Sequence, residues 1–152
     1  MRRGDLAADF ALPDQQGRTR TLVEFLAAGR VVLFFYPAAL TPGCTAESCR
    51  FRDLGAEFSA LGAVRVGVSH DEVATQRRFS ERHDFDFPLL SDVAGAVARA
   101  YGVRRRPSAL GTRRWTFVID RDRRIAEVIK SETRMSAHAD RALAALRELA
   151  SS

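Results

Sequence analysis

The chain has 152 residues, of which 46% are hydrophobic and 28% charged, and its formal net charge at pH 7 is +5. This length favours one domain over residues 1–152, with enough apolar side chains for a core that needs neither disulfide bonds nor a metal. No apolar run approaches the roughly 20 residues of a membrane helix, and no apolar segment follows the basic amino terminus, so we expect a cytoplasmic protein with no membrane partner.

The amino-terminal third predicts a short hairpin or loop and a helix, followed by a buried strand. Residues 30–36, RVVLFFY, form a continuous apolar run rich in β-branched and aromatic residues, which is typical of a strand buried on both faces. Residues 45–61 then predict an amphipathic helix, because apolar side chains recur there at intervals of three and four. These side chains are Phe51, Leu54, Phe58 and Leu61.

The middle of the chain predicts a second strand and two further helices. The strand is expected over residues 64–69, VRVGVS, and the first helix over residues 71–83. Asp92 is a suitable amino-terminal cap for a helix over residues 93–101, and Gly102 is a suitable end for it.

The last third predicts a hairpin and a final helix. Residues 114–120, RWTFVID, and residues 124–131, RIAEVIKS, are separated by the turn sequence RDR, so the two strands are expected to pair antiparallel. Ser136 is expected to cap the last helix, which runs to Leu149 with leucines every three residues on its inner side. Strands that alternate with helices predict a central mixed β-sheet flanked by helices, an α/β sandwich of thioredoxin-like type.

The basic residues gather in three clusters, at 104–106, 113–114 and 121–124. Acidic residues are interleaved with them, and no alternation of aromatic and basic residues marks a surface for stacking bases. No helix-turn-helix or zinc-finger pattern is present either. We therefore expect a solvated basic face and no nucleic-acid partner.

Both cysteines of the chain lie in the stretch YPAALTPGCTAESC, residues 36–49. Cys44 follows a predicted buried strand and opens a predicted helix, and ligand sites in α/β sheets gather at the carboxyl ends of strands. The first turn of a helix has unpaired backbone N–H groups and a partial positive charge, both of which favour a thiolate. The position of Cys44 is therefore that of a reactive cysteine.

The spacing of the two cysteines predicts a conformational switch. In an intact helix the Cα atoms of Cys44 and Cys49 lie about 8.6 Å apart and point about 140° away from each other. A disulfide tolerates at most roughly 7 Å, so the two thiols can bond only if the first turns of the helix unwind.

A metal site and simple packing are the other interpretations of the two cysteines. A structural zinc site needs four ligands, whereas the chain has one cysteine pair, and His70, His83 and His138 show no ligand spacing. We therefore expect no metal and no other cofactor. Two cysteines that only fill apolar space remain an alternative on position alone.

The sequence resembles the peroxiredoxins, and within them the bacterioferritin-comigratory or Q subfamily. The family pattern of Pro, three residues, Thr, two residues and Cys is present as Pro37, Thr41 and Cys44. Segments similar to those of the family follow in family order along the chain. They are ADFALPDQQGR near the start, GVSHDE at 67–72, FPLLSD at 87–92, AYGV at 100–103 and RRWTFVID at 113–120. The compact basic stretch at 104–114 departs from the pattern, since many relatives carry a different loop there.

The resemblance implies a role for each site residue. Cys44 is the peroxidatic cysteine and Cys49 the resolving one, five residues on in the same helix. Arg114, preferred over Arg113 by its position before the last hairpin, stabilises the thiolate and the leaving oxygen.

Three further residues support these groups by the same resemblance. Thr41 contributes a hydroxyl to the thiolate and the peroxide, and Pro37 fixes the backbone and shields the site. Glu47 lies one turn after Cys44 and orients Arg114.

The resemblance implies a thiol peroxidase that reduces hydrogen peroxide and organic hydroperoxides. Cys44 becomes a sulfenic acid, Cys49 converts it to an intramolecular disulfide, and thioredoxin or a similar dithiol reduces that disulfide. Because both thiols lie in one chain, a monomer is favoured. A peroxide-responsive redox sensor acting through a protein partner remains open. A general dithiol oxidoreductase is disfavoured, because its cysteines have two residues between them rather than four.

Overall fold

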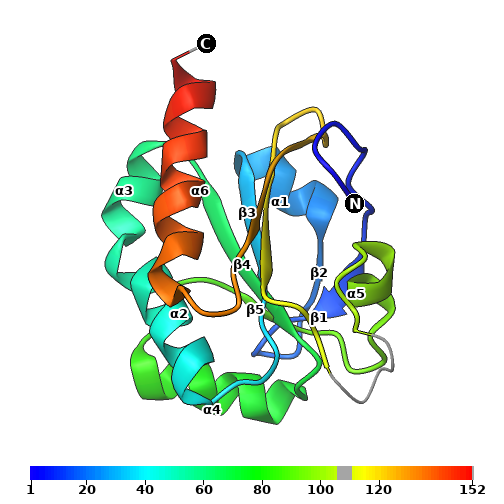
Figure 1. Cartoon of the computed structure of the whole chain (residues 1–152). Coiled ribbons are helices and arrows are strands. Elements are labelled where there is room, and N and C mark those ends of the chain that lie inside the picture. Colours follow the sequence, from blue (N-terminus) through cyan, green and yellow to red (C-terminus); the bar gives the residue numbers. More distant parts are fainter. Residues whose placement is uncertain (106–110, 152) are drawn as a thin grey trace.

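A five-stranded mixed sheet is the centre of the computed structural model, which describes residues 1–105 and 111–151 (Figure 1). The strands lie in the order β5-β4-β3-β6-β7. Their bounds are β3 Val31–Phe35, β4 Val64–Ser69, β5 Leu89–Ser91, β6 Trp115–Ile119 and β7 Ile125–Lys130. β3, β4 and β5 are parallel, whereas β6 is antiparallel to both β3 and β7. The predicted mixed sheet and its antiparallel last hairpin are confirmed.

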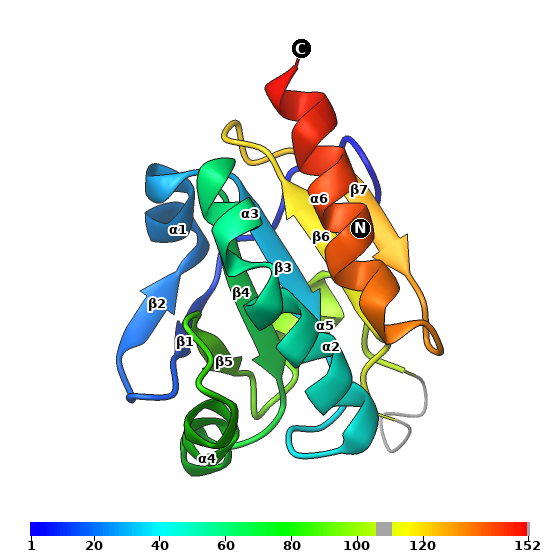
Figure 2. The ribbon, with the colours of Figure 1, turned by 90° about the vertical axis from the view of Figure 1, so that its left-hand side faces the viewer.

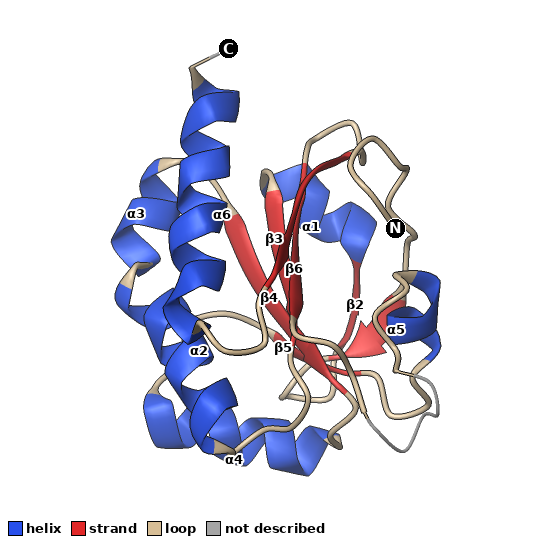
Figure 3. Cartoon of the chain, in the orientation of Figure 1, coloured by secondary structure: helices blue, strands red, loops and turns tan. Residues whose placement is uncertain are grey.

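Helices cover both faces of this sheet (Figure 3). Their bounds are α1 Leu22–Ala28, α2 Pro42–Asp53, α3 Gly55–Ala60, α4 Val73–His83, α5 Ala96–Ala100 and α6 Met135–Ala150. α2, α3 and α6 lie over one face (Figure 2). On the other side are α1, α5 and a small hairpin of β1 (Ala11–Pro13) and β2 (Thr19–Thr21).

β3 is the strand that carries the core. Its five side chains are fully buried and alternate between the two faces of the sheet. Val32 and Phe34 join the cluster under α2 and α6, and Leu33 joins the cluster under α1 and α5. Phe34 stacks on Phe51 of α2, with 4.2 Å between ring centroids, so β3 fixes the position of the helix that carries both cysteines.

The predicted helix over residues 45–61 is two helices, with a break at Leu54. In a continuous helix the carbonyl of Phe51 accepts from the N–H of Gly55. Here that carbonyl accepts from Nη1 of Arg65 at 2.8 Å, and the Arg65 guanidinium lies 3.3 Å from where a Cβ on Gly55 would stand. A side chain from β4 therefore interrupts the helix.

The predicted cap of α5 does not sit next to that helix. α5 begins at Ala96 after Gly95, whose φ is +74°, rather than directly after Asp92. The Asp92 carboxylate still accepts from the N–H groups of Val97 and Ala98, at 3.2 and 2.9 Å. Asp92 therefore stabilises the first turn of α5 from outside it.

One smaller expectation differs from the structure, one matches it, and one strand was missed. Ser136 is the second residue of α6 and does not cap it, because the helix begins one residue earlier, after Arg134. Gly102 follows the end of α5 with a φ of +75°, as its predicted role requires. Strand β5 was not predicted, because three residues are too few for a periodic pattern.

Two further expectations concern the basic stretch at 104–114 and the membrane. Residues 106–110 of that stretch lie outside the described residues, so its departure from the family pattern stays a prediction. Among the helices that the structure describes, none combines the length and the apolar character that crossing a membrane requires.

Candidate active site

Cys44 lies in the first turn of α2, directly after the loop that leaves β3. The loop turns sharply at Leu40, whose φ is +66°, and Thr41 then has an extended backbone before Pro42 begins the helix. Proline suits this first helical position because its φ is already helical and it lacks the N–H that would go unpaired there. The Cys44 side chain is only 1% exposed, so the thiol is enclosed by the loop and the helix.

A guanidinium group lies against the Cys44 sulfur. Nη2 of Arg114 is 3.4 Å from Sγ of Cys44, and Nη1 of Arg114 donates to Oε1 of Glu47 at 2.7 Å. Glu47 is on the same helix as Cys44 and is fully buried. A Cβ on Gly43 would lie 3.3 Å from Nη2, so the glycine leaves room for the guanidinium. The predicted Glu47, Arg114 and Cys44 therefore lie together, with Arg114 bridging the other two.

Burial dominates the electrostatics of this cluster. It raises the pKa of Glu47 to about 8, although Arg114 acts in the opposite direction. Burial acts to lower the pKa of the Arg114 guanidinium, but the neighbouring Glu47 carboxyl and Cys44 sulfur raise it, so the guanidinium stays charged. A fixed positive charge of this kind stabilises a thiolate and a developing oxyanion.

We expect the raised pKa of Glu47 to appear as a pH-dependent stability. The folded protein holds the Glu47 proton up to about pH 8 and the unfolded chain only to about 4.5, so stability is lost as pH rises between these values. Burial lowers the pKa of His138 from its ordinary value of 6.5, so below pH 6.5 His138 makes the stability rise with pH. The effect of Glu47 is therefore separated from that of His138 between pH 6.5 and 8. Urea unfolding should show a slope approaching about 1.4 kcal/mol per pH unit there.

The control for this stability prediction is a matched pair of acid-to-amide substitutions. Glu47→Gln should remove the slope, whereas Glu132→Gln should keep most of it, because the Glu132 side chain is 44% exposed and contributes least to the raised pKa of Glu47. An unchanged slope in Glu47→Gln contradicts the prediction.

Thr41 and Pro37 flank the cysteine. The Thr41 hydroxyl donates to the carbonyl of Ala38 at 2.7 Å, and its lone pairs remain able to accept from another group. Pro37 is half-buried and follows Tyr36, the first residue after β3. These two predicted residues thus shape the loop before Cys44, while Arg114 makes the polar contact with the sulfur.

A second polar cluster supports the loop and was missed by sequence reasoning. The Asp71 carboxylate accepts from the N–H of Ala39 at 2.7 Å, and the hydroxyl of Tyr36 donates to Oε1 of Gln76 at 2.6 Å. Burial raises the pKa of Tyr36 above its ordinary value, so its hydroxyl stays protonated. Asp71 lies in the segment GVSHDE, which the sequence analysis singled out. Its contact with the loop before Cys44 could not be predicted from that segment alone.

Cys49 lies further along α2 and is half-buried, whereas Cys44 is buried, and both thiols are free. Burial raises the pKa of Cys49, and Arg52 partly opposes this effect. A cleft of about 710 Å³ borders Cys49, between α2 and the start of α6, and Met135 also lines it. Both cysteines therefore belong to one wound helix, as predicted, with Cys44 enclosed and Cys49 beside an open cleft.

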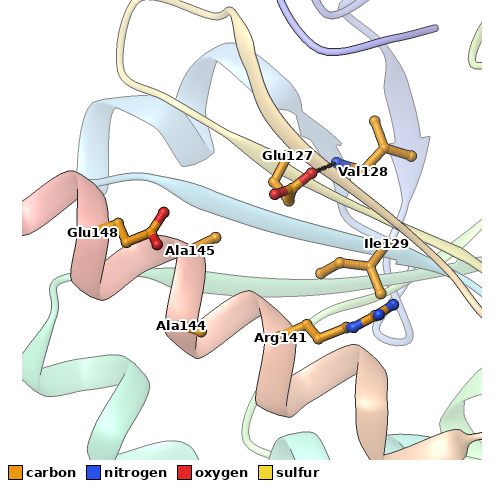
Figure 4. Close-up of a pocket in the computed structure, with 7 residues that line it drawn as sticks. All are labelled: Glu127, Val128, Ile129, Arg141, Ala144, Ala145 and Glu148. Carbon is orange, nitrogen blue, oxygen red and sulfur yellow. Dashed lines mark hydrogen bonds between the residues drawn. The ribbon is translucent and has the colours of Figure 1, made fainter.

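Another pocket, of about 350 Å³, lies between β7 and α6 (Figure 4). Its lining residues are Glu127, Val128, Ile129, Arg141, Ala144, Ala145 and Glu148. None of the predicted site residues lines it. Within residues 1–105 and 111–151, no group of histidine, cysteine and acidic side chains is arranged to hold a metal ion.

The sequence model of the AhpC/TSA family matches residues 3–128 of the chain. The chain belongs to this family. A putative peroxiredoxin of Mycobacterium tuberculosis is 54% identical and aligns over 99% of both chains. The crystal structure of peroxidoxin BcpB from Mycobacterium tuberculosis superposes with a TM-score of 0.93 at 55% identity, over 98% of each chain.

A third comparison supports the subfamily. The bacterioferritin comigratory protein of Xanthomonas campestris, a structure described in terms of alkyl peroxide reduction, matches with a TM-score of 0.85 at 34% identity over 93% and 92% of the two chains. The predicted thioredoxin-like sandwich and the resemblance to bacterioferritin-comigratory peroxiredoxins are therefore confirmed. As a peroxiredoxin, the chain is a peroxidase that uses a peroxide substrate and a thiol reductant.

Proposed function

We propose that this peroxiredoxin reduces hydrogen peroxide and organic hydroperoxides through Cys44. The observation that carries the proposal is the contact of Arg114 Nη2 with the Cys44 sulfur at 3.4 Å, with the guanidinium held by Glu47. The Cys44 thiolate attacks one peroxide oxygen, the O–O bond breaks, and the other oxygen leaves as water or an alcohol after taking a proton. Arg114 stabilises the negative charge as it moves from sulfur to the leaving oxygen. The alkyl peroxide reduction activity of the Xanthomonas protein supports the organic substrates.

The cycle is completed by Cys49. Its thiol attacks the sulfenic sulfur of Cys44, water leaves, and a Cys44–Cys49 disulfide forms. Two thiols of a reductant, for which thioredoxin is the candidate, then return both cysteines to the reduced form by exchange. Both thiols belong to one chain and one helix, so residues 1–152 act as a single domain and a monomer suffices.

Disulfide formation requires α2 to unwind. The two Cα atoms are about 8.6 Å apart in a wound helix, beyond the reach of a disulfide. Unwinding releases the contact between Glu47 and Arg114, and also the surface ion pair of Arg50 with Asp140 of α6 at 2.9 Å. The wound helix is thus the form that reacts with peroxide, and the unwound helix is the form that makes the disulfide.

The cross-link itself tests this function. Reduced protein mixed with one equivalent of hydrogen peroxide should lose both thiols, and mass spectrometry of a digest should find Cys44 joined to Cys49. Retention of both thiols, or a cross-link between two chains, contradicts the proposal. Sustained turnover with thioredoxin, thioredoxin reductase and NADPH separates the peroxidase from a redox sensor, for which oxidation stops after one equivalent.

Replacing Arg114 should slow the first step. In Arg114→Gln the rate constant for oxidation of Cys44 by peroxide is expected to fall about 100-fold, because one fixed charged donor at the reacting atoms is lost. Stopped-flow mixing of reduced protein with peroxide measures it.

Arg113→Gln is the matched control for this substitution. It removes the same charge one residue earlier, where the side chain is exposed, and should stay within about threefold of the original rate since solvent screens that charge. Equal losses in the two variants contradict a local role for Arg114.

A further inference from the structure

His138 is a fully buried histidine to which the peroxide chemistry above gives no task. It lies on α6, and its ring contacts three other segments of the chain. Nε2 is 2.7 Å from the carbonyl oxygen of Ser131, and Nδ1 is 2.8 Å from Oγ1 of Thr116 on β6. Nδ1 is also 3.6 Å from Oε2 of Glu47 on α2. The ring therefore lies directly behind the carboxylate that holds Arg114.

The partners of His138 determine which ring nitrogen carries hydrogen. A backbone carbonyl only accepts hydrogen bonds, so the hydrogen in the contact with Ser131 belongs to Nε2. Burial lowers the pKa of His138, which keeps the ring neutral. Nδ1 is then an acceptor, and the Thr116 hydroxyl donates to it.

Glu47 faces this acceptor with its second oxygen. Oε1 accepts from Arg114, whereas Oε2 is buried and has no hydrogen-bond partner among the described residues. An ionised Glu47 would present a negative oxygen to the lone pair of His138 Nδ1, with no hydrogen between them. A proton on Oε2 removes this repulsion. At 3.6 Å, with the Nδ1 lone pair already accepting from Thr116, the contact is electrostatic and not a hydrogen bond.

We propose that His138 is a positioning residue that keeps a proton on Oε2 of Glu47 by turning toward that oxygen the ring nitrogen that carries no hydrogen, Nδ1, and so leaves the charge of Arg114 available to Cys44. The proposal rests on the peroxidatic role proposed for Cys44. His138 does not touch the peroxide; it acts through Glu47 and Arg114.

The electrostatic consequence follows from the number of negative groups around one guanidinium. If Cys44 and Glu47 were both ionised, two buried negative charges would share the single positive charge of Arg114. Each negative charge would then weaken the attraction between Arg114 and the other one. With Glu47 protonated, the thiolate and Arg114 form a neutral pair. The remaining charged groups that act on His138 are Glu132 in the β7–α6 loop and Arg141 on α6, which are of opposite sign.

The first experiment observes the proton directly and is independent of activity. Infrared difference spectra of the reduced protein between pH 6 and pH 9 should show the loss of a buried carboxylic acid band, and Glu47→Gln should remove that band. The ¹⁵N shifts of His138 should report hydrogen on Nε2 and a bare Nδ1 at pH 7. Absence of the acid band, or a doubly protonated ring, overturns the proposal even if Cys44 proves to be peroxidatic.

The second experiment asks whether His138 sets the pH profile of the first step. The rate of Cys44 oxidation should decline on the alkaline side, near the pH where Glu47 loses its proton, since the extra negative charge then offsets Arg114. In His138→Gln the amide takes the place of Nε2 and can still donate toward the Ser131 carbonyl, but the acceptor facing Glu47 is lost. The alkaline decline in the rate of Cys44 oxidation should shift to lower pH by about one unit, which corresponds to a tenfold lower proton affinity of Glu47.

His138→Asn is the matched variant for this comparison. Its amide takes the place of Nδ1, so it still offers an oxygen to Glu47 and should restore the decline to within about 0.3 unit of the original pH. Both variants remove the ring and lose similar packing, so a purely structural role predicts a uniform loss of rate without a shift. The same profile in both variants, or a shift that persists when His138→Gln is combined with Glu47→Gln, overturns the proposal.

Discussion

Cys44→Ser is expected to consume hydrogen peroxide no faster than a solution of the reductant alone. The serine hydroxyl is not ionised at neutral pH and is a poor nucleophile without a neighbouring base, while the groups around it are Arg114 and Glu47, neither of which is an available base. Removal of a nucleophile costs on the order of a thousandfold or more in rate. The measurement is peroxide loss in the presence of thioredoxin, thioredoxin reductase and NADPH.

The Cys44→Ser variant should keep its fold, which makes the result interpretable. The side chain is 1% exposed, and serine occupies slightly less space than cysteine, so the free energy of unfolding should change by roughly 1 kcal/mol. A matched Cys49→Ser protein, prepared in the same way, should still lose one thiol to one equivalent of peroxide. Retained turnover in Cys44→Ser, with native unfolding behaviour, would assign the chemistry to another group.

Much of the fold could be predicted because its strands are local patterns. β3 is a run of five apolar residues, and its burial on both faces follows from that composition alone. The break in the predicted helix could not be found in this way, because the residue that causes it, Arg65, comes from β4 and takes the carbonyl of Phe51. Helix propensity depends on the residues of the helix itself and cannot predict a contact with a side chain from another element.

The candidate site shows the same division. The positions of Cys44 and Cys49 after a buried strand are readable from the chain, and Arg114 was chosen over Arg113 by resemblance. The structure agrees with this choice in burial, since Arg114 is 7% exposed and reaches the sulfur, whereas Arg113 is exposed. His138 could not have been predicted as part of the site. Its partner Glu47 lies 91 positions away, and only the packing of α6 on α2 brings them together.

Cys49→Ser is expected to stop the catalytic cycle after one oxidation. Cys44 should still form a sulfenic acid, but no other thiol in the chain can attack it, so the disulfide proposed as the substrate of thioredoxin does not form. One equivalent of peroxide should then remove one thiol per chain, whereas two should be lost from the unaltered protein. Turnover with thioredoxin should fall to the level of Cys44→Ser. Cycling at the full rate would show that Cys49 is not the resolving cysteine.

The environment of Cys49 gives this prediction a pH dependence. Burial raises the pKa of its thiol in the wound helix, and in the unwound helix, where it attacks, an ordinary thiol with a pKa of about 8.5 is also mostly protonated at neutral pH. Conversion of the sulfenic acid to the disulfide should therefore accelerate as pH rises from 7 to 9, as the thiolate fraction grows. In Cys49→Ser this second kinetic phase should be absent at every pH, while the first phase remains. A second phase with the same pH dependence in the variant would mean that it reports a rearrangement of α2 rather than the attack of Cys49.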